Sequence, residues 1–206
     1  MPFPRADFLK YDDLRAEVVT FVSGFKVSQA IPVDVEAIAD IRLALDIVPV
    51  AGLRRGRDID GYLSTDRTAI YVDAAMSEGP IFNRYRFTLA HEVGHWYLHE
   101  DLYEAVRKSG SSFVDFHNDL PEEQRMWYEW QAYSFAGLLL VPRDALELEV
   151  ASAINHAKAS GFNSIDPAID AHRSFIAEWA SKAFEVSPEV ILRRGGYDGL
   201  WPKEVD

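Results

Sequence analysis

The chain has 206 residues and a formal net charge of −12 at pH 7, with 48% hydrophobic and 26% charged residues and no cysteine. This length suits one domain with its own core, or one domain plus a small helical appendage. Without cysteine the chain forms no disulfide, and a transition metal has only histidine and carboxylate side chains as ligands. The negative charge opposes binding to nucleic acid or an anionic membrane and favours a basic peptide. A simpler explanation is that surface acids keep the protein in solution.

The hydropathy pattern and the first residues bear on location. No apolar run approaches the roughly 18 residues of a membrane-spanning helix. The opening sequence MPFPRADFLKYDDLR lacks the basic segment and apolar run of a secretion signal. We therefore expect a cytoplasmic protein with no membrane partner.

Hydrophobic spacing predicts helices on both sides of a small antiparallel sheet, which is an α+β fold. Helix boundaries are indicated by capping residues and prolines, and the sheet by two β-prone runs around a polar turn. The expected elements are helices over residues 8–25 and 34–45, a hairpin over 60–72, helices over 82–99 and from just after Pro121 to about Leu140, and tail helices over 167–184 and 188–196. Residues 108–112 are expected to form a flexible connection.

One short motif in the chain carries recognisable chemistry. His91-Glu92-Val93-Gly94-His95 lies in the helix expected over residues 82–99. Side chains four residues apart on a helix share a face, so His91 and His95 can grip one ion. Glu92 is close enough to take a proton from a water molecule at that ion without being a ligand. The motif therefore predicts a metal-dependent hydrolase, with the metal-binding helix at its centre.

The surroundings of the motif strengthen this prediction. The flanking residues are apolar almost all round the helix, which indicates burial. Two histidines and a glutamate in a buried helix are costly unless a metal satisfies them. Gly94 weakens a helix interior by about 0.5–1 kcal/mol relative to alanine, which suggests close approach of another backbone. The alternative is a pair of core histidines bonded to carbonyl oxygens, which leaves Glu92 unexplained.

A catalytic zinc usually has three protein ligands and one position for water. Glu129 shares a stripe with apolar residues, so its carboxylate suits the third position, although an exposed acid at the edge of the stripe remains the alternative. Glu122 and Glu123 are explained by the dipole of their helix. His99 continues the histidine stripe a turn further, about 6 Å along the axis, and a supporting or surface role suits it better than ligation. A site of two histidines and one carboxylate also suits manganese or iron.

Two segments of the chain resemble the ImmA/IrrE family of metallopeptidases, whose pattern is similar to RFTLAHExGH followed by ExxAN-x-FA-x-x-LL-x-P. The matching segments are RFTLAHEVGH at residues 86–95 and EWQAYSFAGLLLVP at residues 129–142. Weaker similarities extend the resemblance over about residues 31–196. Tyr133 stands where the family often has asparagine.

The resemblance implies a gluzincin-like fold with His91, His95 and Glu129 as zinc ligands and Glu92 as the catalytic base. It also implies hydrolysis of a specific protein, such as a transcriptional repressor or an antitoxin. In this interpretation residues 31–160 form the HExxH metallopeptidase domain and residues 1–30 a helical segment packed on it. Residues 161–206 form a helical extension that belongs to the same domain.

Some features of the mechanism stay open at the level of sequence. The side chain that stabilises the oxyanion is one of Tyr133, Tyr128, His117 and His172. We expect the strand over residues 68–72 to pair with an extended substrate. One rival is a non-catalytic zinc-holding sensor or binding module. The other is a DNA-binding regulator that uses the tail helices, although these offer few basic residues and suit core packing better.

Overall fold

The structure, a computed structural model, describes residues 3–57, 59–76, 82–110, 113–162 and 164–202. The chain forms two compact units, one of residues 1–27 and 35–136 and the other of residues 28–34 and 137–206. The division of the sequence at residues 30 and 160 stays a prediction, because compactness alone does not define domains. Within the described part of the chain, every helix is too short or too polar to cross a lipid bilayer.

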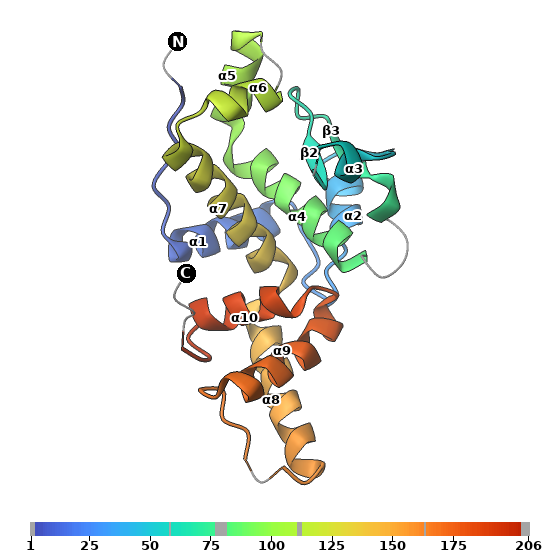
Figure 1. The fold of residues 1–206 in the computed structure, drawn as a ribbon, viewed down its shortest axis with the longest axis vertical. Helices are drawn as coiled ribbons and strands as arrows, with labels where there is room; N and C mark the ends of the chain where they lie inside the picture. The colour runs from blue at the N-terminus through green and yellow to red at the C-terminus, as the bar shows by residue number, and fades with distance from the viewer. Residues whose placement is uncertain (1–2, 58, 77–81, 111–112, 163, 203–206) are drawn as a thin grey trace. The chain divides into compact units, whose positions relative to one another are not determined.

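The first unit holds the sheet and most of the helices (Figure 1). Its elements are α1 (Tyr11–Gly24), α2 (Val35–Ala37), the π-helix η1 (Ile38–Arg42), β1 (Asp46–Val50), α3 (Leu53–Arg57), β2 (Gly61–Leu63), β3 (Ala69–Asp73), the 3-10 helix η2 (Ala74–Met76), α4 (Phe82–Leu98), α5 (Glu100–Ser109), α6 (Phe113–Asp119) and α7 (Glu122–Leu140). The last turn of α7, after residue 136, falls in the second unit.

The sheet has three strands in the order β1-β3-β2. The predicted hairpin is confirmed, because β2 and β3 are antiparallel with Tyr62 opposite Tyr71. Strand β1 pairs with β3 in the parallel sense, so the sheet is mixed rather than wholly antiparallel. Pro49 lies in β1, and proline is tolerated there because β1 is an edge strand. The α+β class predicted from the sequence is confirmed.

Helix α4 packs against β2, β3 and α2. Gly61 makes this contact close: a Cβ atom at this position would lie 2.7 Å from Thr88 Cγ2 and 2.7 Å from Tyr71 O. No larger residue fits without moving β2 away from α4. The glycine therefore holds β2 directly against the helix that carries the histidine motif.

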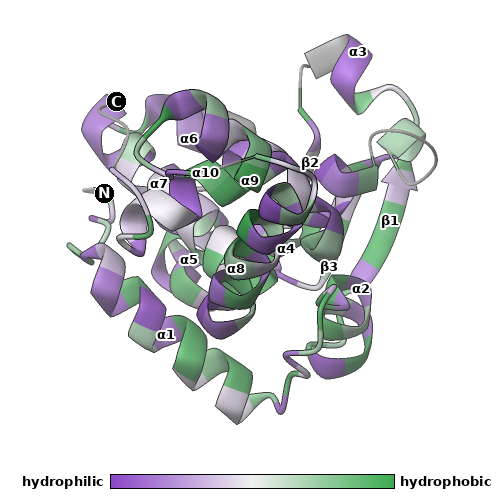
Figure 2. Cartoon of the chain, turned by 90° about the horizontal axis from the view of Figure 1, so that it is seen from below, coloured by the Kyte–Doolittle hydropathy of each residue, from purple (hydrophilic) through white to green (hydrophobic). Residues whose placement is uncertain are grey.

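Helix α1 covers the helical side of the same unit. The helix begins at Tyr11, three residues later than predicted. Its first turn is capped by a hydrogen bond in which the Lys10 N–H donates to Asp13 Oδ2 at 2.8 Å. Figure 2 shows hydrophobic and hydrophilic residues alternating along α1. The aromatic ring of Phe21 meets those of Tyr97 and Phe135 at centroid distances of 5.1 and 5.3 Å, so α1 packs on both α4 and α7. The apolar residues predicted to face inward are buried: Leu14, Val18 and Phe21.

Helices α3, α5, α6 and α8 (Arg143–Ala159) were not predicted from the sequence. Helices α5 and α6 fill the interval between α4 and α7, and Gly110 ends α5 in the left-handed conformation at φ 72°. Residues 111–112, the end of the flexible connection predicted over residues 108–112, lie outside the described residues. Helices α3, α5 and α6 are short, and short helices give a weak periodic signal.

The second unit contains α8 (Arg143–Ala159), α9 (Asp170–Phe184) and α10 (Pro188–Tyr197), with α9 packed against both others. Arg194 of α10 is 3% exposed, donates to Val141 O at 2.9 Å and pairs with Asp198 at 2.9 Å. Its guanidinium therefore lies inside the unit, as the core-packing interpretation of the tail helices expects.

Candidate metal centre

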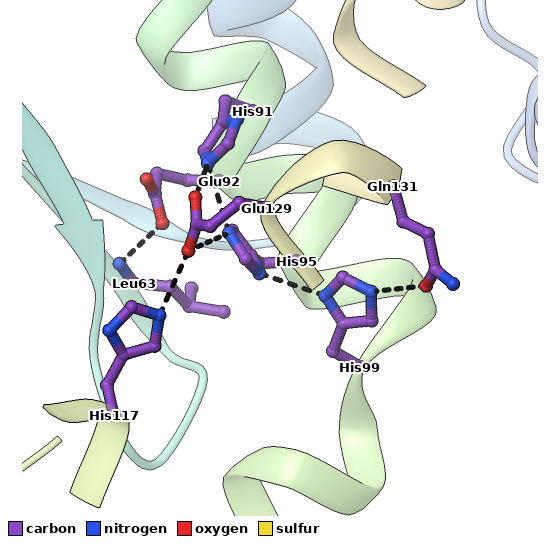
Figure 3. A network of polar contacts seen from close by, with 8 residues as sticks. All are labelled: Leu63, His91, Glu92, His95, His99, His117, Glu129 and Gln131. Carbon is purple, nitrogen blue, oxygen red and sulfur yellow. Dashed lines mark hydrogen bonds and ion pairs between the residues drawn. The ribbon is translucent and has the colours of Figure 1, made fainter. Parts of the chain in front are cut away.

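Two helices of the first unit converge at the histidine motif. His91 and His95 lie one turn apart on α4, and their Nε2 atoms are 3.0 Å from each other. Glu129 reaches them from α7, with Oε2 at 3.2 Å from His91 Nε2 and Oε1 at 3.7 Å from His95 Nε2 (Figure 3). All three side chains thus direct ligand atoms toward one point.

Close approach of the two helices makes this convergence possible. A Cβ atom at Gly94 would lie 3.1 Å from Ala132 O, 3.2 Å from Ala132 Cα and 3.2 Å from Phe135 Cδ1. Gly94 thus lets the backbone of α7 come next to α4 one residue before His95. The sequence-based expectation of a close backbone neighbour at this glycine is confirmed.

The donor set fits a divalent metal ion. One ligand atom from each of His91, His95 and Glu129 lies within 4.8 Å of the others, and no second such group occurs among the residues that the structure describes. Two imidazole nitrogens and a carboxylate oxygen are the ligand types of catalytic zinc sites. Glu122 and Glu123 are exposed in the first turn of α7, as the dipole explanation expects, and lie outside this group.

The electrostatics of the centre favour a charged carboxylate among histidines. Burial would raise the pKa of Glu129, but hydrogen bonds from His117 and His91, together with the nearby His95, lower it far below its usual value. Burial would lower the pKa of His91, yet the hydrogen bond to Glu129 and the charge of Glu92 raise it above 6.5. Negative charge therefore persists at the site over the physiological range, which suits a bound cation.

Glu92 lies beside this group and is held by the sheet. The residue is 6% exposed, and its Oε2 accepts the backbone N–H of Leu63 at 2.8 Å. Leu63 belongs to β2, so the outer edge of the sheet faces the glutamate (Figure 3). This bond has no signal in the sequence, because the donor is a backbone group.

The strand that faces the site is β2 rather than β3. In the hairpin, Ser64 N–H donates to Ala69 O and Asp73 N–H donates to Asp60 O. Because hydrogen-bonded pairs alternate in an antiparallel ladder, the backbone groups of Gly61 and Leu63 point away from β3. The expectation that residues 68–72 pair with a substrate is wrong, since β3 lies between β1 and β2 and has no open edge.

The structure separates the four candidates for oxyanion stabilisation. His117 of α6 lies in the centre, with its Nε2 3.1 Å from Glu129 Oε1. Tyr133 packs on Phe87 at a centroid distance of 4.8 Å, one turn beyond Glu129. Tyr128 is buried against the ring of His99. His172 belongs to the second unit, where its Nδ1 accepts the Asp166 N–H.

His99 is buried rather than at the surface. Its Nδ1 lies 2.9 Å from His95 Nδ1, and its Nε2 lies 3.0 Å from Gln131 Oε1. Burial, followed by the charge of His95, lowers the pKa of His99 to about 3. The sequence predicted that His99 lies on the same helical stripe as His91 and His95. Gln131 was not predicted, and its only signal in the sequence is a polar residue two positions after Glu129.

Paired histidines on one helix, a glutamate from a second helix and a buried acid beside the first histidine could together hold a metal ion in the way that metallopeptidases do. The model of the Peptidase M78 family, the IrrE N-terminal-like domain, matches residues 56–194, and the chain belongs to this family. The resemblance to the ImmA/IrrE family is thereby confirmed. A comparison with curated proteins gave no match.

Proposed function

We propose that this protein is a zinc-dependent endopeptidase in which His91, His95 and Glu129 hold the ion and Glu92 is the catalytic base. The observation that carries the proposal is the meeting of these four side chains at the outer edge of β2. A structural metal site needs no acid beside its ligands, so the buried Glu92 favours catalysis over a sensor.

A zinc ion in this centre would supply a Lewis acid that activates water and polarises the scissile carbonyl. Glu92 accepts the proton of the attacking water and then passes it to the leaving amine. The N–H of Leu63 holds one carboxylate oxygen of Glu92 and so fixes the orientation of the base. His117 donates to Glu129 Oε1 and thereby orients that carboxylate between the two helices.

The substrate is proposed to be an extended segment of a protein that adds to the edge of β2. The Leu63 N–H is held by Glu92, so the outward groups left for an added strand are the N–H and C=O of Gly61 and the C=O of Leu63. A substrate strand paired with β2 would lie next to Glu92, because Leu63 of β2 contacts this residue. The scissile bond would then lie close to the proposed base. The net charge of −12 favours a segment that contains lysine or arginine.

The partner that we propose is a transcriptional repressor or an antitoxin-like protein, on the grounds of family membership. Direct binding of nucleic acid or membrane is not part of the proposal, because the charge opposes both. A protein encoded by the neighbouring reading frame is the first candidate to test.

Two assays test this proposal with the zinc-loaded chain. In the first, a mixture of synthetic peptides is incubated with the wild type and with Glu92→Gln, and new termini are read by mass spectrometry. In the second, each form is co-produced with the candidate partner, and the intact mass of the partner is measured. Peptidase activity predicts discrete fragments with the wild type alone.

The outcomes separate the proposal from its alternative. Cleavage by neither form in either assay, while zinc binds tightly, would support a non-catalytic sensor or binding module. Degradation of many unrelated proteins would reject a specific partner. Fragments that appear equally with both forms would reject Glu92 as the base.

A further inference from the structure

A chain of three buried polar side chains runs away from the metal centre through the first unit. His95, His99 and Gln131 are 4%, 3% and 1% exposed. His95 Nδ1 meets His99 Nδ1 at 2.9 Å, and His99 Nε2 meets Gln131 Oε1 at 3.0 Å (Figure 3). Gln131 Nε2 then donates to the backbone carbonyl of Asp7. The chain therefore ends on the segment that precedes α1.

The positions of the protons follow from the far end of this chain. A backbone carbonyl only accepts, so the amide nitrogen of Gln131 faces Asp7 and its oxygen faces His99. That oxygen also only accepts, so His99 carries its proton on Nε2. Within the described residues, His99 is hydrogen-bonded to His95 and Gln131 and to no acid, and it is buried, which makes the neutral ring the less costly form.

The same reasoning reaches the metal ligand. A neutral His99 with its proton on Nε2 has a bare Nδ1, which accepts a hydrogen bond. The facing atom, Nδ1 of His95, must then donate. With its proton on Nδ1, neutral His95 has its lone pair on Nε2, the atom that faces His91 and Glu129.

We propose that His99 and Gln131 are positioning residues that fix the tautomer of His95. The backbone carbonyl of Asp7 sets the donor-to-acceptor direction of every hydrogen bond in this series. Asp7 O orients Gln131, Gln131 orients His99, and His99 holds the His95 ring with Nε2 ready to bind zinc. This deepens the proposed function and rests on it for the metal centre to which His95 belongs. Support of this kind typically changes metal affinity by about 10–100-fold.

The structure offers a matched pair of glutamines for the test. Gln131 and Gln124 both lie on α7 and both bind the N-terminal segment, because Gln124 Oε1 accepts the Ala6 N–H at 2.9 Å. Only Gln131 also contacts His99. Gln131→Met removes the acceptor for His99 Nε2–H with little change of shape, whereas Gln124→Met removes only a tether of the N-terminal segment.

A second pair of variants addresses His99 itself. Asparagine and leucine have nearly the same shape, but only asparagine places an oxygen close to where Nδ1 of the histidine lies. His99→Asn therefore keeps an acceptor for His95 Nδ1–H, and His99→Leu removes it. This pair gives an answer even if Gln131→Met fails to fold, and a loss shared by both members would indicate a structural role.

The first readout uses the metal-free protein at about pH 8, where unpaired histidines are neutral. Nitrogen-15 NMR of the imidazole rings reports which nitrogen carries the proton. We expect the proton on Nε2 of His99 and on Nδ1 of His95 in the wild type and in Gln124→Met. In Gln131→Met a substantial fraction of His99 should carry its proton on Nδ1 instead.

The second readout is the zinc dissociation constant, measured by competition with a chelator. Gln131→Met and His99→Leu should weaken zinc binding by about 10–100-fold. Gln124→Met should stay close to the wild type, and His99→Asn should recover most of the affinity lost in His99→Leu.

The inference is overturned if wild-type His99 carries its proton on Nδ1, or if both glutamine variants bind zinc equally well. Absence of zinc binding by the wild type, with the expected tautomers present, would instead reject the proposed metal centre and leave the hydrogen-bonded chain intact.

Discussion

Replacing Glu92 with glutamine separates catalysis from metal binding. The substitution keeps the size of the side chain, and the amide oxygen can still accept the Leu63 N–H that is now 2.8 Å from Oε2. The amide nitrogen then faces the site and cannot accept a proton from water. Loss of a general base typically costs a factor of about 10²–10⁴ in rate, which corresponds to about 3–5.5 kcal/mol in the activation free energy.

The zinc affinity of this variant should be retained. The charge of Glu92 helps to raise the pKa of His91, so its removal lowers that pKa and weakens competition by protons for this ligand. The assay compares cleavage rate, zinc content and melting temperature of Glu92→Gln with those of the wild type. Unchanged cleavage would refute Glu92 as the base. Loss of zinc together with activity would show that the glutamate acts through the metal ligands.

Three further predictions concern the metal centre. Glu129→Ala should weaken zinc binding far more than Glu123→Ala, as measured by chelator competition, and equal effects would remove Glu129 from the ligand set. Because the pKa of His91 is raised above 6.5, its proton is held to higher pH in the metal-free protein, so zinc affinity should fall as pH decreases from about 8 to 6. An affinity that is flat over this range would contradict the ionisation described. Gly94→Ala gains about 0.5–1 kcal/mol of helix propensity but overpacks the contact with α7 by about 1–3 kcal/mol, so the free energy of unfolding should decrease and zinc affinity with it. A more stable variant with normal zinc binding would show that the two helices can separate freely.

Local patterns in the chain were sufficient for the elements that carry the site. Helix α4 was predicted because apolar residues surround the histidine motif, and α7 because its apolar stripe ends before Pro142. The hairpin was predicted from two β-prone runs around a polar turn. Helix α8 was not predicted although Leu146, Val150 and Ala153 recur at helical spacing, because Pro142 follows the end of α7 and is also the N-cap of α8, so one proline marks both a helix end and a helix start.

By itself the sequence determined which residue types could meet a metal and on which helices they lie, because the spacing of four residues fixes a shared helical face. It also determined that Gly94 needs a close neighbour. Only the tertiary structure decided that the neighbour is α7, that β2 rather than β3 has the open edge, and that a backbone N–H holds Glu92. The direction of the hydrogen bonds that link His95 to Asp7 likewise depends on a contact between residues more than a hundred positions apart. Such contacts depend on how elements pack in space, and local periodicity contains no information about that packing.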